Sequence, residues 1–404
     1  MPNWKRLSAG EIGTFMGGSG FPNRFQGRTS GDIPFFKVSD MNSVGNELFL
    51  SSANNYVDER SRKAIGAVLV PKGAIVFAKV GAAVFLERKR ILAQPSCIDN
   101  NMAALIVRDG AFDVRFVHYL LNAVKLSSFA TPGALPSLNS KQLRSIEFDI
   151  PDSIEEQRKI SKTLGEVDNL ISSLDHLVEK KRRVSEGVQR ELLLGSKRLS
   201  GYSETWESVS LSEVASGGRG AGLSKSSISQ FGEFPCLLYG ELFTTYGRTI
   251  ESVKSFTNES SGVLSSGGEV LIPGSTTTVA EDLATASALL QPGVLIGGDV
   301  NILRPDKSRV DPSWLAYYLS VACKRQIKES GQGTTIVHVY VKSLLGLNVA
   351  LPPIAEQRAI ARVLQDCDNE LALLYKRLEA SHAIKRGMLQ ELTPRLSRQI
   401  VRGI

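Results

Sequence analysis

The stretch "PDSIEEQRKISKTLGEVDNLISSL" (Pro151–Leu174) recurs two hundred residues later as "PPIAEQRAIARVLQDCDNELALL" (Pro352–Leu374). Both copies keep the order Ile-x-Glu-Gln-Arg-x-Ile, then Leu, Asp-Asn and Leu. From Ile154 and Ile354 onward the two segments align without a gap over the length of a long helix. A repeat at this distance predicts one structural unit that the chain uses twice.

Each copy predicts a helix with one narrow apolar stripe. A proline precedes each copy, and proline suits the first turn of a helix. The apolar positions advance by alternating steps of four and three residues, which is typical of a coiled-coil seam. A helix of about 36 residues is about 54 Å long, too long for one small domain to cover. We therefore expect the two helices to pack antiparallel on each other through Ile160, Leu164, Val167, Ile171, Leu174 and Val178 in one helix, and Ile360, Leu364, Leu371, Leu374 and Leu378 in the other.

The stripe is interrupted at matched places in the two helices. Polar residues stand where apolar ones are due, namely Lys181, Ser185, Ser381 and Lys385. We expect Val184 and Ile384 to take over the packing there. Glycine inside a helix costs about 1 kcal/mol relative to alanine. The matched Gly187 and Gly387 therefore predict either a close approach of two helices or a kink.

Polar residues also recur near the start of each helix. Asp168 and Asp368 lie next to the stripe, where they either set the register or face solvent. Glu156-Gln157-Arg158 and Glu356-Gln357-Arg358 lie where each globular region meets its helix. They either bind a partner or bond back to the globular region and fix its angle. We favour the second, because polar residues at a helix start usually satisfy local backbone groups.

The repeat extends upstream into the globular regions. "FVHYLLNAV" (Phe116–Val124) and "WLAYYLSVA" (Trp314–Ala322) predict two short helices at equivalent places. Short apolar runs separated by Gly, Ser, Asn and Pro predict a mixed α/β (α+β) fold with mostly antiparallel strands. We divide the chain into a globular region at 1–150, a helix at 151–200, a second globular region at 201–351 and a second helix at 352–404.

Composition sets broad limits. The chain has 404 residues, of which 42% are hydrophobic and 22% charged, as in ordinary globular proteins. Its net charge is +7, which permits a nucleic-acid partner without demanding one. No apolar run is long enough to cross a membrane, and no secretory signal opens the chain. The four cysteines form no C-x-x-C pair, so we expect a cytoplasmic protein with no metal site.

The paired helix openings resemble a known family. "I-x-E-Q-R-x-I", preceded by proline and placed twice after a globular region of about 150 residues, resembles the specificity subunit of Type I restriction-modification systems. The resemblance implies that each globular region is a target recognition domain for one half of a split, asymmetric DNA site. It also implies that the helices form the spacer between the two halves. The expected partners are double-stranded DNA, two methyltransferase (modification) subunits and ATP-driven motor-nuclease (restriction) subunits. S-adenosylmethionine, ATP and Mg²⁺ are expected in those partners, with no cofactor in this chain.

No catalytic motif stands against this interpretation. The sequence lacks the Asn/Asp-Pro-Pro-Tyr/Phe motif of amino-methyltransferases and the Gly-Lys-Ser/Thr of a phosphate-binding loop. We therefore predict a DNA-recognition subunit without catalytic activity. The alternatives are a coiled-coil scaffold, a stand-alone DNA-binding adaptor, or a nuclease or methyltransferase with an unrecognised active site.

Basic and hydroxyl side chains outside the helices are the candidate DNA contacts. Arginine reads guanine through two parallel hydrogen bonds, and lysine binds phosphates. In the first globular region the candidates are Arg24, Arg28, Lys79, Arg88, Lys89 and Arg90. In the second they are Arg219, Lys225, Thr334, Thr335 and Lys342. We favour Lys79 and Arg88 in the first, and Arg219 and Lys342 in the second. The run "ERKR" is equally consistent with a solvated charge cluster.

Overall fold

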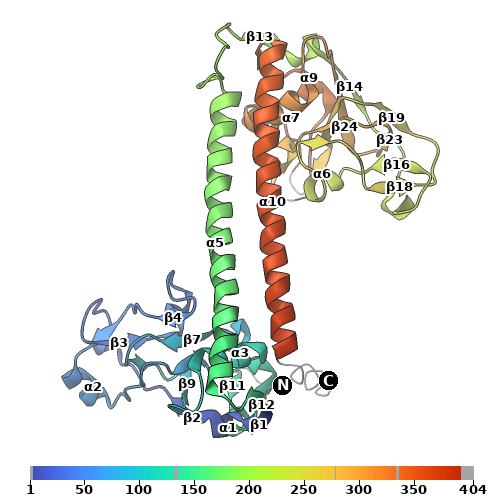
Figure 1. Ribbon diagram of the computed structural model, residues 1–404. Helices are drawn as coiled ribbons and strands as arrows, with labels where there is room; N and C mark the ends of the chain where they lie inside the picture. The colour runs from blue at the N-terminus through green and yellow to red at the C-terminus, as the bar shows by residue number, and fades with distance from the viewer. Residues whose placement is uncertain (1–2, 132–134, 278, 334–335, 393–404) are drawn as a thin grey trace. The chain divides into compact units, whose positions relative to one another are not determined.

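The computed structural model describes residues 3–131, 135–277, 279–333 and 336–392 (Figure 1). The chain divides into two compact units. One unit contains the residues up to Ser173 together with those from Leu378 onward, and the other is Leu174–Arg377. Each unit therefore combines one globular head with portions of both long helices.

The head of the first unit is built on small, mainly antiparallel sheets. Its central sheet has the strand order β2 (Gly13–Gly17), β9 (Met102–Val107), β6 (Ile75–Ala78), β7 (Lys89–Leu92) and β4 (Phe49–Leu50). The other strands are β1 (Trp4–Ser8) paired with β12 (Glu147–Pro151), β10 (Ala130–Thr131) paired with β11 (Ser137–Leu138), and the three-stranded set β5 (Tyr56–Val57), β3 (Ile33–Phe36) and β8 (Cys97–Ile98). The short helices are α1 (Ala9–Ile12), α2 (Glu59–Ile65), α3 (Val114–Ala123) and α4 (Ser140–Arg144).

The head of the second unit repeats this plan. Its central sheet has the order β14 (Ala215–Arg219), β24 (Val300–Pro305), β20 (Glu269–Pro273), β22 (Ser287–Leu289) and β17 (Thr249–Ile250). A second sheet has the order β15 (Ile228–Ser229), β18 (Ser255–Thr257), β16 (Phe234–Leu237), β23 (Pro292–Ile296) and β19 (Val263–Ser266). Two further pairs are β13 (Glu207–Ser210) with β26 (Asn348–Leu351) and β21 (Ser275–Thr276) with β25 (Val337–His338). The short helices are α6 (Glu241–Thr244), α7 (Pro312–Val321), α8 (Lys324–Glu329) and α9 (Val341–Leu345).

The two predicted long helices are present. They are α5 (Ile154–Leu193) and α10 (Ile354–Leu392). Acidic residues occupy the first turn of each helix, where they complement the positive end of the helix dipole. The predicted upstream helices are present as α3 and α7, and most strand pairs are antiparallel, as expected.

Ion pairs connect α5 and α10 within each unit. In the first unit, Asp168 of α5 pairs with Lys385 of α10 at 2.5 Å. In the second unit, Lys181 of α5 pairs with Glu370 of α10 at 2.7 Å. Within the second unit, Leu193 near the end of α5 also shares a hydrophobic core with Ile360 near the start of α10. The portions of α5 and α10 in this unit therefore run antiparallel; a continuous antiparallel coiled coil stays a prediction.

The predicted packing positions are largely enclosed. Among the eleven, Ile160, Leu164, Ile171, Leu174, Val178, Ile360, Leu364 and Leu374 are buried, and Val167, Leu371 and Leu378 are partly buried.

The prediction for the interrupted part of the stripe is wrong. Val184 and Ile384 are more than half exposed, whereas Ser185 and Ser381 are buried. The buried positions keep the alternating four- and three-residue spacing, and small serines occupy two of them. A side-chain carbon placed on Gly187 or Gly387 would meet open space, so these glycines do not mark a close approach within the described residues.

Each head shares a hydrophobic core with the first turns of its own long helix. In the first unit, Phe116 and Leu120 of α3 pack in one cluster with Ile160 and Leu164 of α5. In the second unit, the buried face of α7 joins Ile360 and Leu364 of α10. Figure 1 shows α3 beside the start of α5, and α7 beside the start of α10. Head and helix are therefore one folding unit at each end of the repeat.

Candidate nucleic-acid interface

A buried glutamine joins each long helix to its head. The side-chain oxygen of Gln157 accepts a hydrogen bond from the backbone N–H of Asp113 at 2.9 Å, and that of Gln357 accepts one from Asp311 at 2.8 Å. Both glutamines are fully buried. The two aspartates cap α3 and α7, so each glutamine holds the start of a head helix. The glutamine of each Glu-Gln-Arg motif thus has the role that we favoured, whereas Arg158 and Arg358 are exposed.

A tyrosine–aspartate bond makes a second connection in each unit. The Tyr119 hydroxyl donates to Asp168 at 2.7 Å, and the Tyr317 hydroxyl donates to Asp368 at 2.6 Å. Burial and the neighbouring carboxylate raise the pKa of both phenols, so both keep their protons at neutral pH. Asp168 and Asp368 are therefore bonded to the heads, an outcome that neither of our two interpretations included.

Different cations accompany the two aspartates. Asp168 has an ion pair with Lys385, and Arg115 lies beside the Tyr119 hydroxyl. Asp368 has no ion pair among the described residues. Arg248 lies near it, where burial lowers the pKa of the guanidinium and the carboxylate opposes that shift. The two units thus share the same two bonds but neutralise the carboxylate differently.

A third anchor, in the second unit, was not expected from the sequence. Glu356 is fully buried and accepts hydrogen bonds from Arg198 at 2.5 and 2.6 Å and from the Trp206 indole at 3.1 Å. The Arg198 guanidinium also lies over the Trp206 ring, 5.4 Å from its centroid. The segment that follows α5 is therefore fastened to the first turn of α10. An arginine and a tryptophan 150 residues or more from their partner give no local signal in the sequence.

The prediction that Lys89 contacts DNA is wrong. Its side chain is 1% exposed, pairs with Glu87 at 2.6 Å and donates to the Val124 carbonyl at 2.9 Å. Burial lowers the pKa of Lys89, and Glu87 partly restores it. The run "ERKR" (87–90) is therefore not a solvated charge cluster, and not all of its basic residues can contact DNA, because Lys89 is buried.

The other candidates of the first head are accessible to different degrees. Arg24 is exposed and lies 5.0 Å from the Phe25 ring, and Arg28 is exposed and pairs with Asp58 at 3.0 Å. Arg88 donates to the Asn42 side chain, and Arg90 is only partly exposed.

Lys79 and Arg219 occupy neighbouring places at the same edge of the two central sheets. The registers of β2, β9 and β6 match those of β14, β24 and β20, with Gly17 at the place of Arg219. The Lys79 ammonium lies 3.0 Å from where a side chain on Gly17 would begin. The structure therefore brings a cation to this edge in each head, which the sequence alone did not show.

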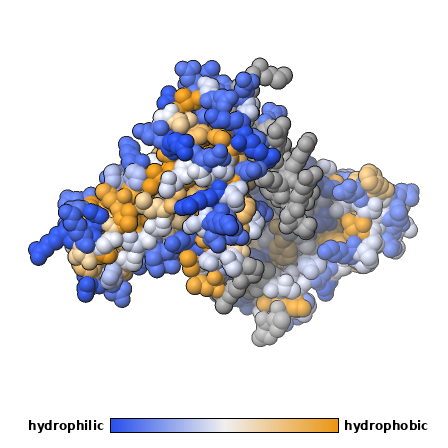
Figure 2. All heavy atoms as spheres, turned by 90° about the horizontal axis from the view of Figure 1, so that it is seen from below, coloured by the Kyte–Doolittle hydropathy of each residue, from blue (hydrophilic) through white to orange (hydrophobic). Residues whose placement is uncertain are grey.

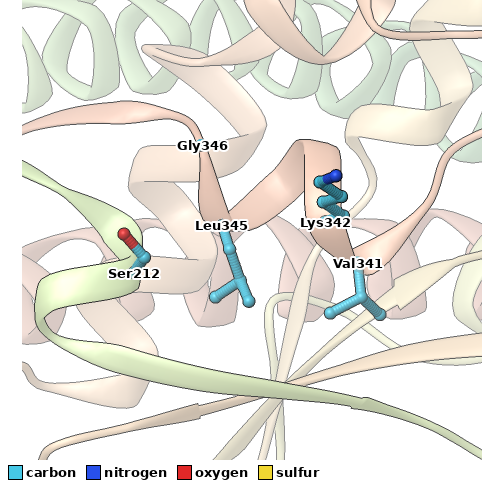
Figure 3. Close-up of a pocket in the computed structure, with 5 residues that line it drawn as sticks. All are labelled: Ser212, Val341, Lys342, Leu345 and Gly346. Carbon is cyan, nitrogen blue, oxygen red and sulfur yellow. The ribbon is translucent and has the colours of Figure 1, made fainter.

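The remaining candidates of the second head lie on its surface or outside the described residues. Lys225 is exposed at the start of a short turn, and Lys342 is exposed on α9. Figure 3 shows Lys342 directed away from Val341 and Leu345, which face a shallow depression of about 400 Å³. Thr334 and Thr335 lie outside the described residues.

Hydropathy does not single out an interface on the face drawn in Figure 2. Figure 2 shows hydrophilic and hydrophobic side chains mixed over the face drawn there. In the described part of the chain, no helix is both long and apolar enough to cross a membrane.

Comparison with known proteins identifies the family. The model of the Type I restriction modification DNA specificity domain matches residues 1–180 and again residues 203–380. The chain belongs to this family. Each match spans one head and most of its long helix, so the repeat found in the sequence is the family's domain used twice.

Relatives of the specificity family cover most of the chain. The MjaX specificity subunit assigned in Methanocaldococcus jannaschii is 24% identical over 356 residues, covering 83% of this chain and 81% of the relative. The MjaVIII specificity subunit of the same organism is 22% identical, covering 76% and 75%. The solved specificity subunit of a Type I system from M. genitalium has a TM-score of 0.64 at 16% identity, covering 97% and 96%, and supports the fold.

Family membership confirms the predicted role. Members of the specificity family recognise DNA and carry no catalytic activity of their own. This chain is therefore a DNA-recognition subunit of the Type I restriction-modification class, as its paired helix openings predict.

Proposed function

We propose that the chain reads a bipartite, asymmetric double-stranded DNA target. Residues 1–150 would read one half-site and residues 201–351 a different one. The observation that carries this proposal is that the two heads share the same anchors to their helices but differ at the edges of their central sheets. Gln157 and Gln357 make the same bond to their heads, whereas Gly17 in one head corresponds to Arg219 in the other.

Two copies of a methyltransferase (modification) subunit are the proposed protein partners. A chain that uses one domain twice offers each of its surfaces twice, which favours two copies of one partner. Motor-nuclease (restriction) subunits would join this complex for cleavage. S-adenosylmethionine, ATP and Mg²⁺ would bind in these partners, and the complex would act in the cytoplasm.

A head exchange tests the division of labour. Residues 201–351 are replaced by the matching region of a relative, and the methylated sequence is mapped in cells that also express the modification subunits. We expect one half of the target to change and the other half to stay the same. A palindromic parental target, or a change in both halves, would contradict the proposal.

Native mass spectrometry tests the partners separately. At saturating modification subunit, we expect two copies per chain, and a limit of one copy would contradict the two-site proposal. Salt titration of the complex separates DNA recognition from a purely structural scaffold. The logarithm of affinity should fall by about 0.9 per neutralised phosphate for each decade of salt, whereas a scaffold gives no such slope.

A further inference from the structure

Arg219 differs from the other exposed arginines of the second head in how it is held. Its Nε donates to the Gly298 carbonyl at 2.9 Å, and its Nη2 donates to Asp299 at 2.5 Å. The other oxygen of Asp299 accepts a hydrogen bond from the buried Ser275 hydroxyl. The carboxylate is therefore fixed from behind, and it fixes the guanidinium in turn.

The backbone beside Arg219 is fixed as well. Gly220 donates its N–H to the Val300 carbonyl at 2.9 Å. A side-chain carbon on Gly220 would lie 2.0 Å from the Gly297 carbonyl oxygen, so only glycine fits there. The strand end that carries Arg219 is consequently held against the neighbouring loop.

This arrangement contributes little to folding. The Arg219 side chain is 51% exposed and that of Asp299 is 29% exposed, and exposed ion pairs add little to stability. Ordering a long arginine side chain also has an entropic cost. A surface side chain that is already ordered loses little freedom on binding, so Arg219 is suited to hold a ligand.

The free part of the guanidinium defines that ligand. Arginine has five N–H donors, and two of them are used by Gly298 and Asp299. The remaining donors include the pair at the far end of the planar group. Two parallel donors match O6 and N7 of guanine in the major groove, the commonest specific contact of arginine with DNA. We propose that Arg219 reads a guanine in the half-site of the second head, with Asp299 and Ser275 as its positioning residues.

The surroundings suit a base edge. His338 is the cross-strand neighbour of Ser275, and its ring stacks on Tyr340 with centroids 6.3 Å apart. Tyr340 is 46% exposed, so an accessible aromatic ring lies two residues beyond the cross-strand neighbour of Ser275. In the first head Lys79 brings a cation to the equivalent edge, so the same edge faces DNA in both heads under this proposal.

The inference rests on the proposed function and is tested on the complex of the full chain with its modification subunits. The target is first mapped from methylation, and binding is then measured to duplexes that carry each single-base change in the second half-site. We expect the unaltered chain to prefer guanine at one position by about 5- to 150-fold, the range for one bidentate base contact. Arg219→Lys should reduce this preference to less than about twofold while the salt dependence stays the same. The positive charge remains in this variant, but the two parallel N–H donors of the guanidinium are lost.

Two further variants make the test sharper. Asp299→Asn keeps the shape of the positioning group and should weaken the guanine preference less than Arg219→Lys does. Arg309→Ala is the matched control, because Arg309 is a partly exposed arginine of this head that also has an ion pair, with Glu207 at 3.0 Å. It should leave every base preference in place.

The outcomes distinguish a failure of the proposed function from a failure of the role assigned to Arg219. A wild-type complex without any sequence preference overturns the proposed function. A sequence-specific complex whose second half-site has no G·C pair, or whose preferences survive Arg219→Lys, overturns only the role of Arg219. If Arg219→Ala weakens all sequences equally and lowers the salt slope by about one, Arg219 contacts a phosphate and the base-reading role is wrong.

Discussion

The tyrosine–aspartate bonds predict that the two heads respond unequally to the same mutation. Tyr317→Phe removes the hydrogen bond to Asp368, which has no ion pair among the described residues. A hydrogen bond to a charged group contributes about 1.5–3 kcal/mol, and the carboxylate then stays partly buried without it. Tyr119→Phe leaves Asp168 with Lys385 at 2.5 Å, so we expect a smaller loss of about 0.5–1.5 kcal/mol.

Hydrogen exchange measured by mass spectrometry resolves these local effects, since a chain of two units need not unfold in one step. Backbone amides of α7 should exchange about 10- to 150-fold faster in Tyr317→Phe, and those of α3 about 2- to 12-fold faster in Tyr119→Phe. Tyr375→Phe is the control, because Tyr375 is 47% exposed on α10. Equal acceleration in both heads, or none in α7, would refute the reasoning.

Three other predictions concern stability and spacing. Acidification from about pH 6.5 toward pH 4 should destabilise the first unit by up to about 3 kcal/mol. Burial lowers the pKa of His118 to about 4, although the Lys89 carbonyl that bonds to its ring favours the protonated form. Arg90, Asp168 and Lys385 are the charged groups near this ring. As the pH falls, the unfolded chain therefore binds a proton at His118 before the folded chain does. His118→Gln should flatten this pH dependence in thermal unfolding. Glu87→Ala should cost about 3 kcal/mol by leaving Lys89 buried without its partner, and adding Lys89→Met should restore part of that loss in the same assay. Inserting four residues into each long helix, after Ser173 and after Arg377, lengthens each helix by about 6 Å. Methylation mapping should then show more spacer bases between two unchanged half-sites. An altered half-site would contradict the spacer model.

The sequence predicts the repeated elements better than the contacts between them. The periodic residues of α5 and α10 specify helices and their shared seam because burial repeats with the helix period. The same rule misjudged Val184 and Ser185, because a small polar residue can occupy a buried seam position where two helices pack. Contacts such as Glu356 with Arg198 depend on residues that are distant in sequence, and periodicity carries no information about them.

The candidate DNA contacts were likewise predicted only in part from the sequence. Residue type and charge suggested Lys79 and Arg219, but only the strand registers place them at equivalent sheet edges. Charge alone also suggested Lys89, which the fold uses as a buried partner for Glu87. A basic residue predicts a DNA contact only when the strand that carries it leaves the side chain at the surface.

The unequal neutralisation of Asp168 and Asp368 bears on how heads can be exchanged. Arg248, which lies near Asp368, belongs to the second head and moves with residues 201–351. Lys385, which pairs with Asp168, belongs to α10 and stays behind when residues 1–150 are replaced. A transplanted second head therefore brings the cation near Asp368, whereas a transplanted first head brings only Arg115, beside the Tyr119 hydroxyl, and the ion-pair partner of Asp168 comes from the receiving helix. The glutamine and tyrosine bonds are the same in both units. If the two head exchanges differ in how well the new head fits the receiving helix, we expect the ion-pair partner of the aspartate to be the cause.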